Sequence, residues 1–124
     1  MNDKSQLLKG TLEGCILKVI SIRETYGYEI SEKLTEHGFP NISEGTIYPL
    51  LMRLEKNGFI TANYKQSSQG PRRKYFNLTE AGLRELEAFW ERWILLEHAI
   101  HQLFNPKEGL SHDSSKYHQA EKKQ

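Results

Sequence analysis

The hydrophobic period of this 124-residue chain changes twice, and these changes constrain its fold more than any other feature. Up to Leu54 the apolar residues recur at helical spacing, whereas residues 60–65 and 73–78 alternate apolar and polar side chains. The helical period returns after Thr79. Because helices and strands differ in this period, we expect several helices, then one hairpin, then a final helix. The sequence therefore predicts a mostly α-helical fold with a small β-hairpin, in the α+β class.

A first helix is expected from about Ser5 to Arg23, where apolar residues recur at helical spacing: Leu8, Leu12, Cys15, Ile16 and Val19. Gly10 and Gly14 lie four residues apart on a neighbouring face of this helix. A glycine inside a helix costs up to about 1 kcal/mol relative to alanine. We therefore expect either close approach of another helix at these glycines or simply a weak helix.

A second helix is expected from Gly27 to a stop at Gly38, and a third helix ends at Gly58. Either Ser43 or Thr46 could cap the start of the third helix, which carries the apolar stripe Ile47, Leu50, Leu51 and Leu54. Pro49 bears on this choice, because proline lacks an N–H group. It removes one helical hydrogen bond if the helix begins at Ser43, and it is harmless if regular helix begins near Thr46.

The two predicted strands are joined by QSSQGPR, residues 66–72, and Thr79 is expected to cap the last helix. In that helix six residues occupy heptad positions a and d: Leu86, Phe89, Trp93, Leu96, Ile100 and Leu103. Trp90, Ile94 and Phe104 widen this apolar stripe. The tail over residues 105–124 is polar, and we expect it to be disordered.

The predicted order of elements is that of a winged helix-turn-helix, with the hairpin as the wing. The whole chain has a net charge of only +1, but residues 53–74 contain six basic side chains and one acidic one, a local charge of +5. Local positive charge favours contact with phosphates. We expect DNA contacts from Ser43, Glu44, Gly45, Thr46, Tyr48, Pro49 and Arg53 in the third helix and from Lys65, Gly70, Arg72, Arg73 and Lys74 in the wing. The alternative is a solvated hairpin.

The last helix predicts a homodimer, because a small domain cannot bury an apolar stripe of this width by itself. The expected interface comprises Leu86, Phe89, Trp93, Leu96, Ile100 and Leu103, with Gly10 and Gly14 of the first helix. Trp93 is bulky for a tight two-stranded seam. Two such indoles would either leave a gap lined by aromatic faces or pack without a gap against the partner's first helix.

Other classes of function find less support in the sequence. No apolar run is long enough to cross a membrane, and the first residues do not resemble a secretory signal, so we expect a cytoplasmic protein. The single cysteine, Cys15, is expected to be a core residue. For His98 and His101 we favour an exposed helix face over a metal site. No catalytic constellation appears, so we expect neither an enzyme nor a cofactor.

Three stretches of the sequence carry a family resemblance: YGYEISEKL, EGTIYPLLMRLEKNGFI and GPRRKYFNLTEAG. Together they resemble the PadR-like family of bacterial winged-helix transcriptional regulators. The resemblance implies a homodimer, usually a repressor, that binds a palindromic operator in double-stranded DNA and often releases it on binding a small effector. It implies DNA contacts for Tyr48 and its neighbours and a wing tip formed by Gly70, Arg72 and Arg73.

The single short C-terminal helix resembles the compact branch of this family, whose multidrug-sensing members stack planar aromatic ligands on a tryptophan. Trp93 matches that position, with Trp90 and Phe89 as further effector-binding candidates. The larger C-terminal domain of phenolic-acid sensors is missing, which argues against a phenolic acid as the effector.

The predicted organisation is a DNA-binding winged helix over residues 1–78, a dimerisation helix over residues 79–104, and the tail. Two other interpretations remain open. One is a winged-helix protein-interaction module that has lost DNA binding, and the other is a ligand or metal sensor without direct DNA binding.

Overall fold

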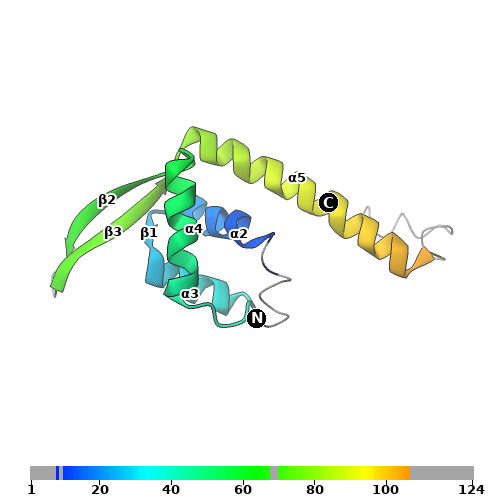
Figure 1. Cartoon of the computed structure of the whole chain (residues 1–124), viewed down its shortest axis with the longest axis horizontal. Helices are drawn as coiled ribbons and strands as arrows, with labels where there is room; N and C mark the ends of the chain where they lie inside the picture. The colour runs from blue at the N-terminus through cyan, green and yellow to red at the C-terminus, as the bar shows by residue number, and fades with distance from the viewer. Residues whose placement is uncertain (1–7, 9, 68–69, 107–124) are drawn as a thin grey trace. The chain divides into compact units, whose positions relative to one another are not determined.

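The computed structural model describes Leu8, residues 10–67 and residues 70–106, and it confirms the predicted fold class. Its elements are α2 (Leu12–Ile22), β1 (Thr25–Tyr26), α3 (Gly27–Glu36), α4 (Glu44–Lys56), β2 (Ile60–Ser67), β3 (Gly70–Leu78) and α5 (Glu80–Phe104) (Figure 1). The chain divides into two compact units, one ending at Phe89 and the other beginning at Trp90, so α5 belongs to both. The predicted disordered tail lies outside the described residues from residue 107 onward.

The prediction of one continuous first helix is wrong, because α2 begins at Leu12 after a turn at Gly10 and Thr11. The backbone N–H and the hydroxyl of Thr11 both donate to the carbonyl of Leu8, at 2.9 and 3.1 Å. These two bonds close a turn where a helix would have continued. Gly10 and Gly14 therefore do not share a helix face. The part of the predicted helix before Leu8 lies outside the described residues.

The predicted helix stops at Gly38 and Gly58 are confirmed. Both glycines have positive φ, +102° and +81°, a conformation that side chains with a β-carbon rarely adopt. In each case the N–H of the residue after the glycine bonds back five residues: Phe39 to the carbonyl of Leu34 at 3.1 Å, and Phe59 to that of Leu54 at 3.0 Å. This is the Schellman arrangement, and it ends α3 and α4 where the next segment must turn away.

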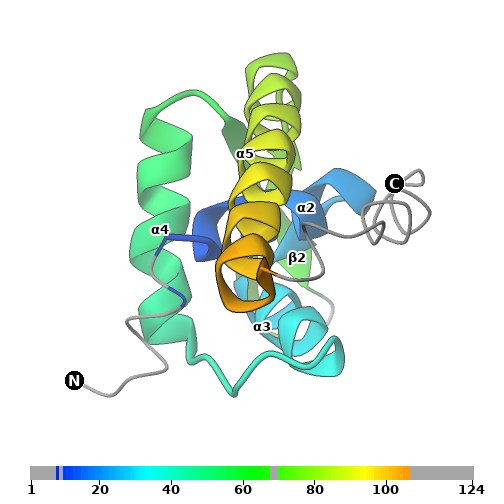
Figure 2. The same ribbon diagram turned by 90° about the vertical axis from the view of Figure 1, so that its right-hand side faces the viewer.

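The core of the first unit lies among α2, α3, α4 and the base of the sheet. Its buried apolar side chains are Leu12, Ile16, Leu17, Ile20, Ile30, Leu34, Ile42, Ile47, Leu51, Leu54, Ile60 and Phe76. Figure 2 shows the loop that connects α3 to α4. Ser31 holds this connection, because its hydroxyl donates to the carbonyl of Ile42 at 2.6 Å. Burial of Ile47, Leu51 and Leu54 fixes which face of α4 is turned inward.

The sheet has three antiparallel strands in the order β1–β3–β2, where the sequence predicted only a two-stranded hairpin. Strand β1 has two residues, too few to show a period, and it pairs Thr25 with Phe76. The hairpin of β2 and β3, called the wing below, is also longer than predicted, because Gly70, Pro71 and Arg72 belong to β3. It extends away from α2, α3 and α4 (Figure 1).

Candidate nucleic-acid interface

The outward surface of α4 begins at its N-terminal cap. Of the two predicted caps the structure selects Ser43, whose hydroxyl accepts from the backbone N–H of Thr46 at 3.3 Å. The helix therefore starts at Glu44, and of the two alternatives for Pro49 the structure selects the one in which it lies inside the helix and removes a hydrogen bond. Its missing N–H leaves the carbonyl of Gly45 without its usual donor four residues on. Ser43, Glu44, Gly45 and Thr46 are all exposed.

Further along the outward face of α4, some exposed side chains are uncharged and one is held in an ion pair. Tyr48 is 48% exposed, and Pro49 is exposed beside it. Arg53 is exposed too, but its Nε lies 2.7 Å from a carboxylate oxygen of Glu13 on α2. This ion pair ties Arg53 to the domain and neutralises its charge locally. The sequence had no local sign of it, because the two residues are 40 positions apart.

Arg72 and Arg73 lie on opposite faces of β3, and each is stacked on a tyrosine. The guanidinium of Arg72 lies 5.0 Å from the ring centre of Tyr64 on β2, and that of Arg73 lies 4.3 Å from the ring centre of Tyr26 on β1. Both arginines are exposed, and neither forms an ion pair with an acidic group among the described residues. Cation–π stacking holds the guanidinium groups in place while leaving their N–H donors available.

Lys65 and Lys74 are paired with carboxylates. Lys65 forms an ion pair with Glu24, which also accepts from the Asn77 amide at 2.8 Å. The hydrogen bonds from Lys65 and then Asn77 lower the pKa of Glu24 below its ordinary value. Nζ of Lys74 lies 3.3 Å from Oε1 of Glu55 on α4. Three of the six cations behind the predicted +5 charge are thus paired, two of them with Glu13 and Glu24, which lie outside that stretch of sequence.

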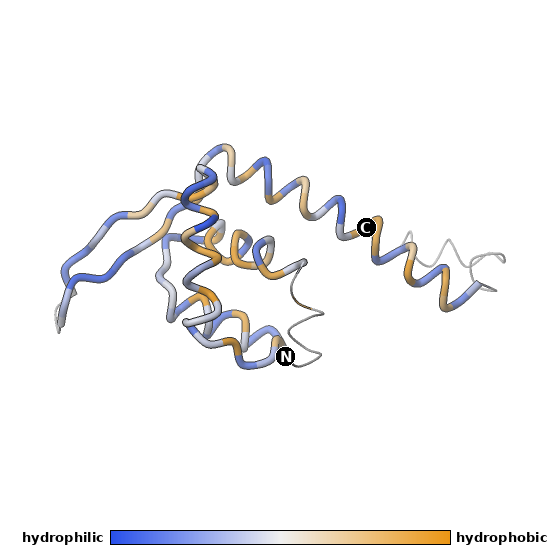
Figure 3. Tube along the Cα trace, in the orientation of Figure 1, coloured by the Kyte–Doolittle hydropathy of each residue, from blue (hydrophilic) through white to orange (hydrophobic). Residues whose placement is uncertain are grey.

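The predicted interface residues of α5 fall into two groups. In the first unit, Leu86 packs against the core, and the ring of Phe89 occupies the space that a side chain at Gly14 would need. In the second unit, Leu96, Ile100 and Leu103 are 53%, 47% and 75% exposed. Hydrophobic residues recur along this half of the helix (Figure 3). Gly14 is therefore buried by its own chain, whereas Gly10 is exposed.

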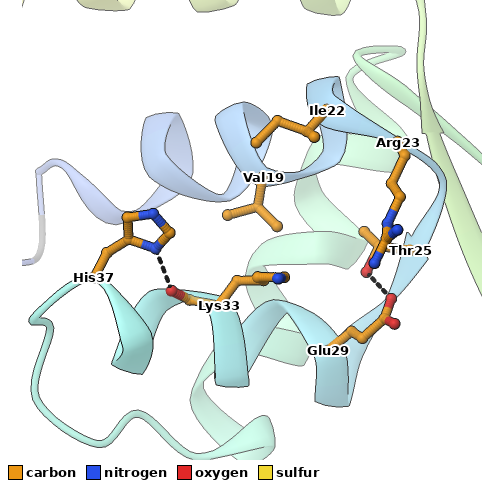
Figure 4. Close-up of a pocket in the computed structure, with 7 residues that line it drawn as sticks. All are labelled: Val19, Ile22, Arg23, Thr25, Glu29, Lys33 and His37. Carbon is orange, nitrogen blue, oxygen red and sulfur yellow. Dashed lines mark hydrogen bonds between the residues drawn. The ribbon is translucent and has the colours of Figure 1, made fainter.

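The two candidate effector tryptophans differ in their exposure within the single chain. Trp90 is 58% exposed and Trp93 is partly exposed. A small apolar cavity of about 50 Å³ does lie between α2 and α3, lined by Val19, Ile22, Arg23, Thr25, Glu29, Lys33 and His37 (Figure 4). Apolar cavities that hold benzene measure about 150 Å³, so this one is too small for a planar aromatic molecule.

The remaining sequence predictions concern the cysteine, a metal site and a membrane-spanning helix. Cys15 packs against the core, and burial raises the pKa of its thiol, which keeps it protonated. Within the described residues no group of three or more His, Cys, Asp or Glu side chains is placed to hold a metal ion. Nor does any helix in that part of the chain combine the length and apolar character needed to cross a bilayer.

Comparison with known proteins agrees with this geometry. The model of the transcriptional regulator PadR-like family matches residues 16–88. A PadR-like transcriptional regulator from Bacillus cereus is 51% identical, with 81% of this chain and 97% of that chain covered and a TM-score of 0.72. A PadR family transcriptional regulator from Eggerthella lenta is 32% identical, with coverage of 80% and 86% and a TM-score of 0.73.

Curated relatives extend the comparison. An uncharacterized protein of Lysinibacillus sphaericus is 35% identical over 100 residues, which cover 78% of this chain and 91% of the relative. A transcriptional regulator of Mycobacterium tuberculosis is 33% identical over 67 residues, 54% of this chain and 61% of its own length. Members of the matched family regulate transcription and are not enzymes. With its helix-turn-helix and wing, the chain belongs to the PadR-like family of DNA-binding transcriptional regulators.

Proposed function

We propose that the protein is a homodimeric repressor that places α4 in the major groove of a palindromic operator and lays its wing on the phosphate backbone. The observation that carries this proposal is that some of the basic residues pair with carboxylates and others do not. Arg72 and Arg73 are exposed and stacked on tyrosines, with no carboxylate paired to either among the described residues. Positive charge that remains unneutralised at the far part of the wing favours a polyanion.

The N-terminal end of α4 supports base contact. Its exposed residues, from Ser43 to Thr46, are small or short apart from Glu44, so a base edge has room to approach the backbone. The partial positive charge of a helix N-terminus also favours phosphates. Tyr48 adds an exposed ring and a hydroxyl on the same surface. Such an arrangement supports base contacts from α4 and phosphate contacts from the wing.

The exposed apolar face of α5 supports the homodimer. Leu96, Ile100 and Leu103 share one side of the helix by their spacing, and all three are exposed in the single chain. A two-fold symmetric pairing would bury this face in both copies. It would also present two α4 helices to half-sites about 34–36 Å apart, one turn of DNA. Palindromic operators follow from that symmetry.

The effector part of the proposal concerns Trp93, with Trp90 and Phe89 as lesser candidates. Because Phe89 packs beside Gly14 in the first unit, it is less available than the two tryptophans. Two copies of Trp93 facing each other across a dimer axis would form walls for a planar aromatic effector. Titration with a panel of planar aromatic dyes should quench tryptophan emission in the wild type. The quenching should disappear in Trp93→Ala, while operator binding is retained.

The DNA-binding proposal is tested by the salt dependence of binding. In Arg72→Ala/Arg73→Ala, affinity should fall to a similar degree for all duplexes, and the slope of log affinity against log salt should decrease by about 0.9 per lost phosphate contact. Arg84→Ala changes an exposed arginine on α5 and serves as the matched control. An unchanged slope in the double variant would contradict the wing contact. Failure of the wild type to bind any duplex would instead favour a protein-interaction module.

A further inference from the structure

Lys74 is the one predicted DNA-binding cation that faces into the domain. Its side chain is only 18% exposed, and its Nζ lies 3.3 Å from Oε1 of Glu55 on α4. Arg72, two residues earlier on the same face of β3, is exposed. A phosphate approaching from solvent therefore meets Arg72 and not Lys74.

Three aromatic rings from three elements surround the ammonium group of Lys74. Its Nζ lies 5.9 Å from the ring centre of Tyr48 on α4, 5.9 Å from that of Tyr64 on β2, and 5.6 Å from that of Phe76 on β3. These distances are within the roughly 6 Å range of cation–π attraction. The same ammonium group thus contacts α4 through Tyr48 and Glu55 and the wing through Tyr64.

The charge of Lys74 is retained at this site. Burial by itself lowers the pKa of the lysine, but the hydrogen bond and Coulomb attraction from Glu55, together with smaller contributions from Tyr48 and Tyr64, outweigh it, so the pKa lies above its ordinary value. A charged lysine beside a charged glutamate adds almost no net field toward a distant phosphate. The positive charge of Lys74 instead stabilises the contact between α4 and the wing.

We propose that Lys74 is a positioning residue: it fixes the wing relative to α4, and thereby favours operator DNA over other sequences, without binding phosphate itself. The inference rests on the proposed DNA-binding function. Base contacts from α4 and phosphate contacts from the wing form together only when the two elements keep the right spacing. Non-specific binding has no such requirement, because phosphates are equally available in any register.

One substitution separates positioning from phosphate binding by the sign of its effect. Glu55→Gln keeps the size of the side chain but removes its charge. If Lys74 is a positioning residue, this variant should weaken operator binding about threefold to tenfold, in keeping with the modest energy of a partly exposed ion pair. If Lys74 binds phosphate, releasing it from Glu55 should strengthen binding to every duplex.

The measurements use a duplex selected by the wild-type protein from a random-sequence library and a scrambled duplex of the same length, each over a range of salt concentrations. Lys74→Met should weaken binding to the selected duplex by a similar factor. It should leave the scrambled duplex and the salt slope unchanged. Arg72→Ala is the matched control, because it should weaken both duplexes and reduce the slope by about 0.9.

The reciprocal variant Glu55→Lys/Lys74→Glu tests the pair directly. It should recover part of the operator preference that Lys74→Glu alone loses, which a simple loss of a phosphate ligand cannot do.

A slope reduced by about 0.9 in Lys74→Met, or unchanged preference in both Lys74→Met and Glu55→Gln, would overturn the inference. If Lys74→Met does not fold, Glu55→Gln decides the question. If Arg72→Ala weakens binding but neither Lys74→Met nor Glu55→Gln reduces the preference for the operator, the positioning role of Lys74 is refuted and the proposed DNA-binding function is not.

Discussion

The two halves of α5 have similar apolar spacing but different surroundings. Over residues 80–89, Gly82 is buried and Leu86 packs against the core of the first unit. Over residues 90–104, six large apolar side chains are exposed: Trp90, Leu95, Leu96, Ile100, Leu103 and Phe104. Heptad spacing thus predicts which residues must be covered, but it does not say whether the cover comes from the same chain or from another one.

Two glycines allow the first half of α5 to pack closely against the rest of the first unit. A β-carbon on Gly82 would overlap the backbone carbonyl of Phe59, so only glycine allows α5 to begin this close to the end of α4. Gly14 makes room on α2 for the ring of Phe89 in the same way. Thr79 adds a polar anchor, because its hydroxyl accepts from the N–H of Gly82 at 2.9 Å.

The largest expected effect comes from a charge placed in the exposed half of α5. Leu96→Glu should convert the proposed dimer to a monomer, because burying an unpaired carboxylate costs several kcal/mol. The first unit should stay folded, since Leu96 lies outside it. Light scattering would measure the mass, and circular dichroism would measure the helix content.

Leu95→Glu is the matched control for this variant. Leu95 is 72% exposed but lies away from the a and d positions, so the same charge there should leave the dimer intact. Dissociation by Leu95→Glu, together with a dimeric Leu96→Glu, would place the interface on another face of α5.

A smaller effect is expected where the first half of α5 meets α2. In Gly14→Ala the new methyl group would overlap the ring of Phe89. Overpacking of this kind costs about 1–3 kcal/mol, which the better helix propensity of alanine, about 1 kcal/mol, offsets only in part. We expect thermal unfolding several degrees below that of the wild type.

Gly10→Ala is the comparison for Gly14→Ala, because no atom lies within 4 Å of a β-carbon at Gly10. Its melting temperature should stay close to that of the wild type. A loss of stability in Gly10→Ala that depends on protein concentration would return Gly10 to the dimer interface that the sequence predicted.

The smallest expected effect concerns the ion pair of Glu24, which links the segment before β1 to the wing. Because folding lowers the pKa of Glu24, the pair stabilises the folded state above the ordinary carboxyl pKa. That contribution should disappear as the pH falls through the lowered value. Urea denaturation of the wild type and Glu24→Gln should differ at neutral pH and converge in acid. A difference that is independent of pH would show that the glutamine acts through packing or geometry.

Much of the fold could be predicted from local patterns. The ends of α3 and α4 follow from glycines that adopt positive φ. The inward face of α4 follows from apolar residues three and four positions apart. Each of these features is decided within about one helical turn, which is why the sequence alone is sufficient.

Other features were missed because they depend on distant residues or on very short segments. Strand β1 exists only because β3 pairs with it, and two residues carry no period. The turn at Gly10 depends on the two bonds from Thr11 to Leu8, in a stretch whose apolar spacing favours a helix. The partners of Arg53 and Lys65 lie 40 and 41 residues away, so counting charges along the chain overstated the free charge of the interface.

The sequence by itself determined the order of the main helices and the hairpin, the glycine stops of α3 and α4, and the apolar stripes, because hydrophobic period and backbone preference act over short distances. Only the tertiary structure decided which basic side chains pair with a carboxylate and which do not. Arg72, Arg73 and Lys74 are consecutive in the sequence, yet a strand sends neighbouring side chains to opposite faces. Packing against α4 then places Lys74 beside Glu55 and leaves Arg72 exposed.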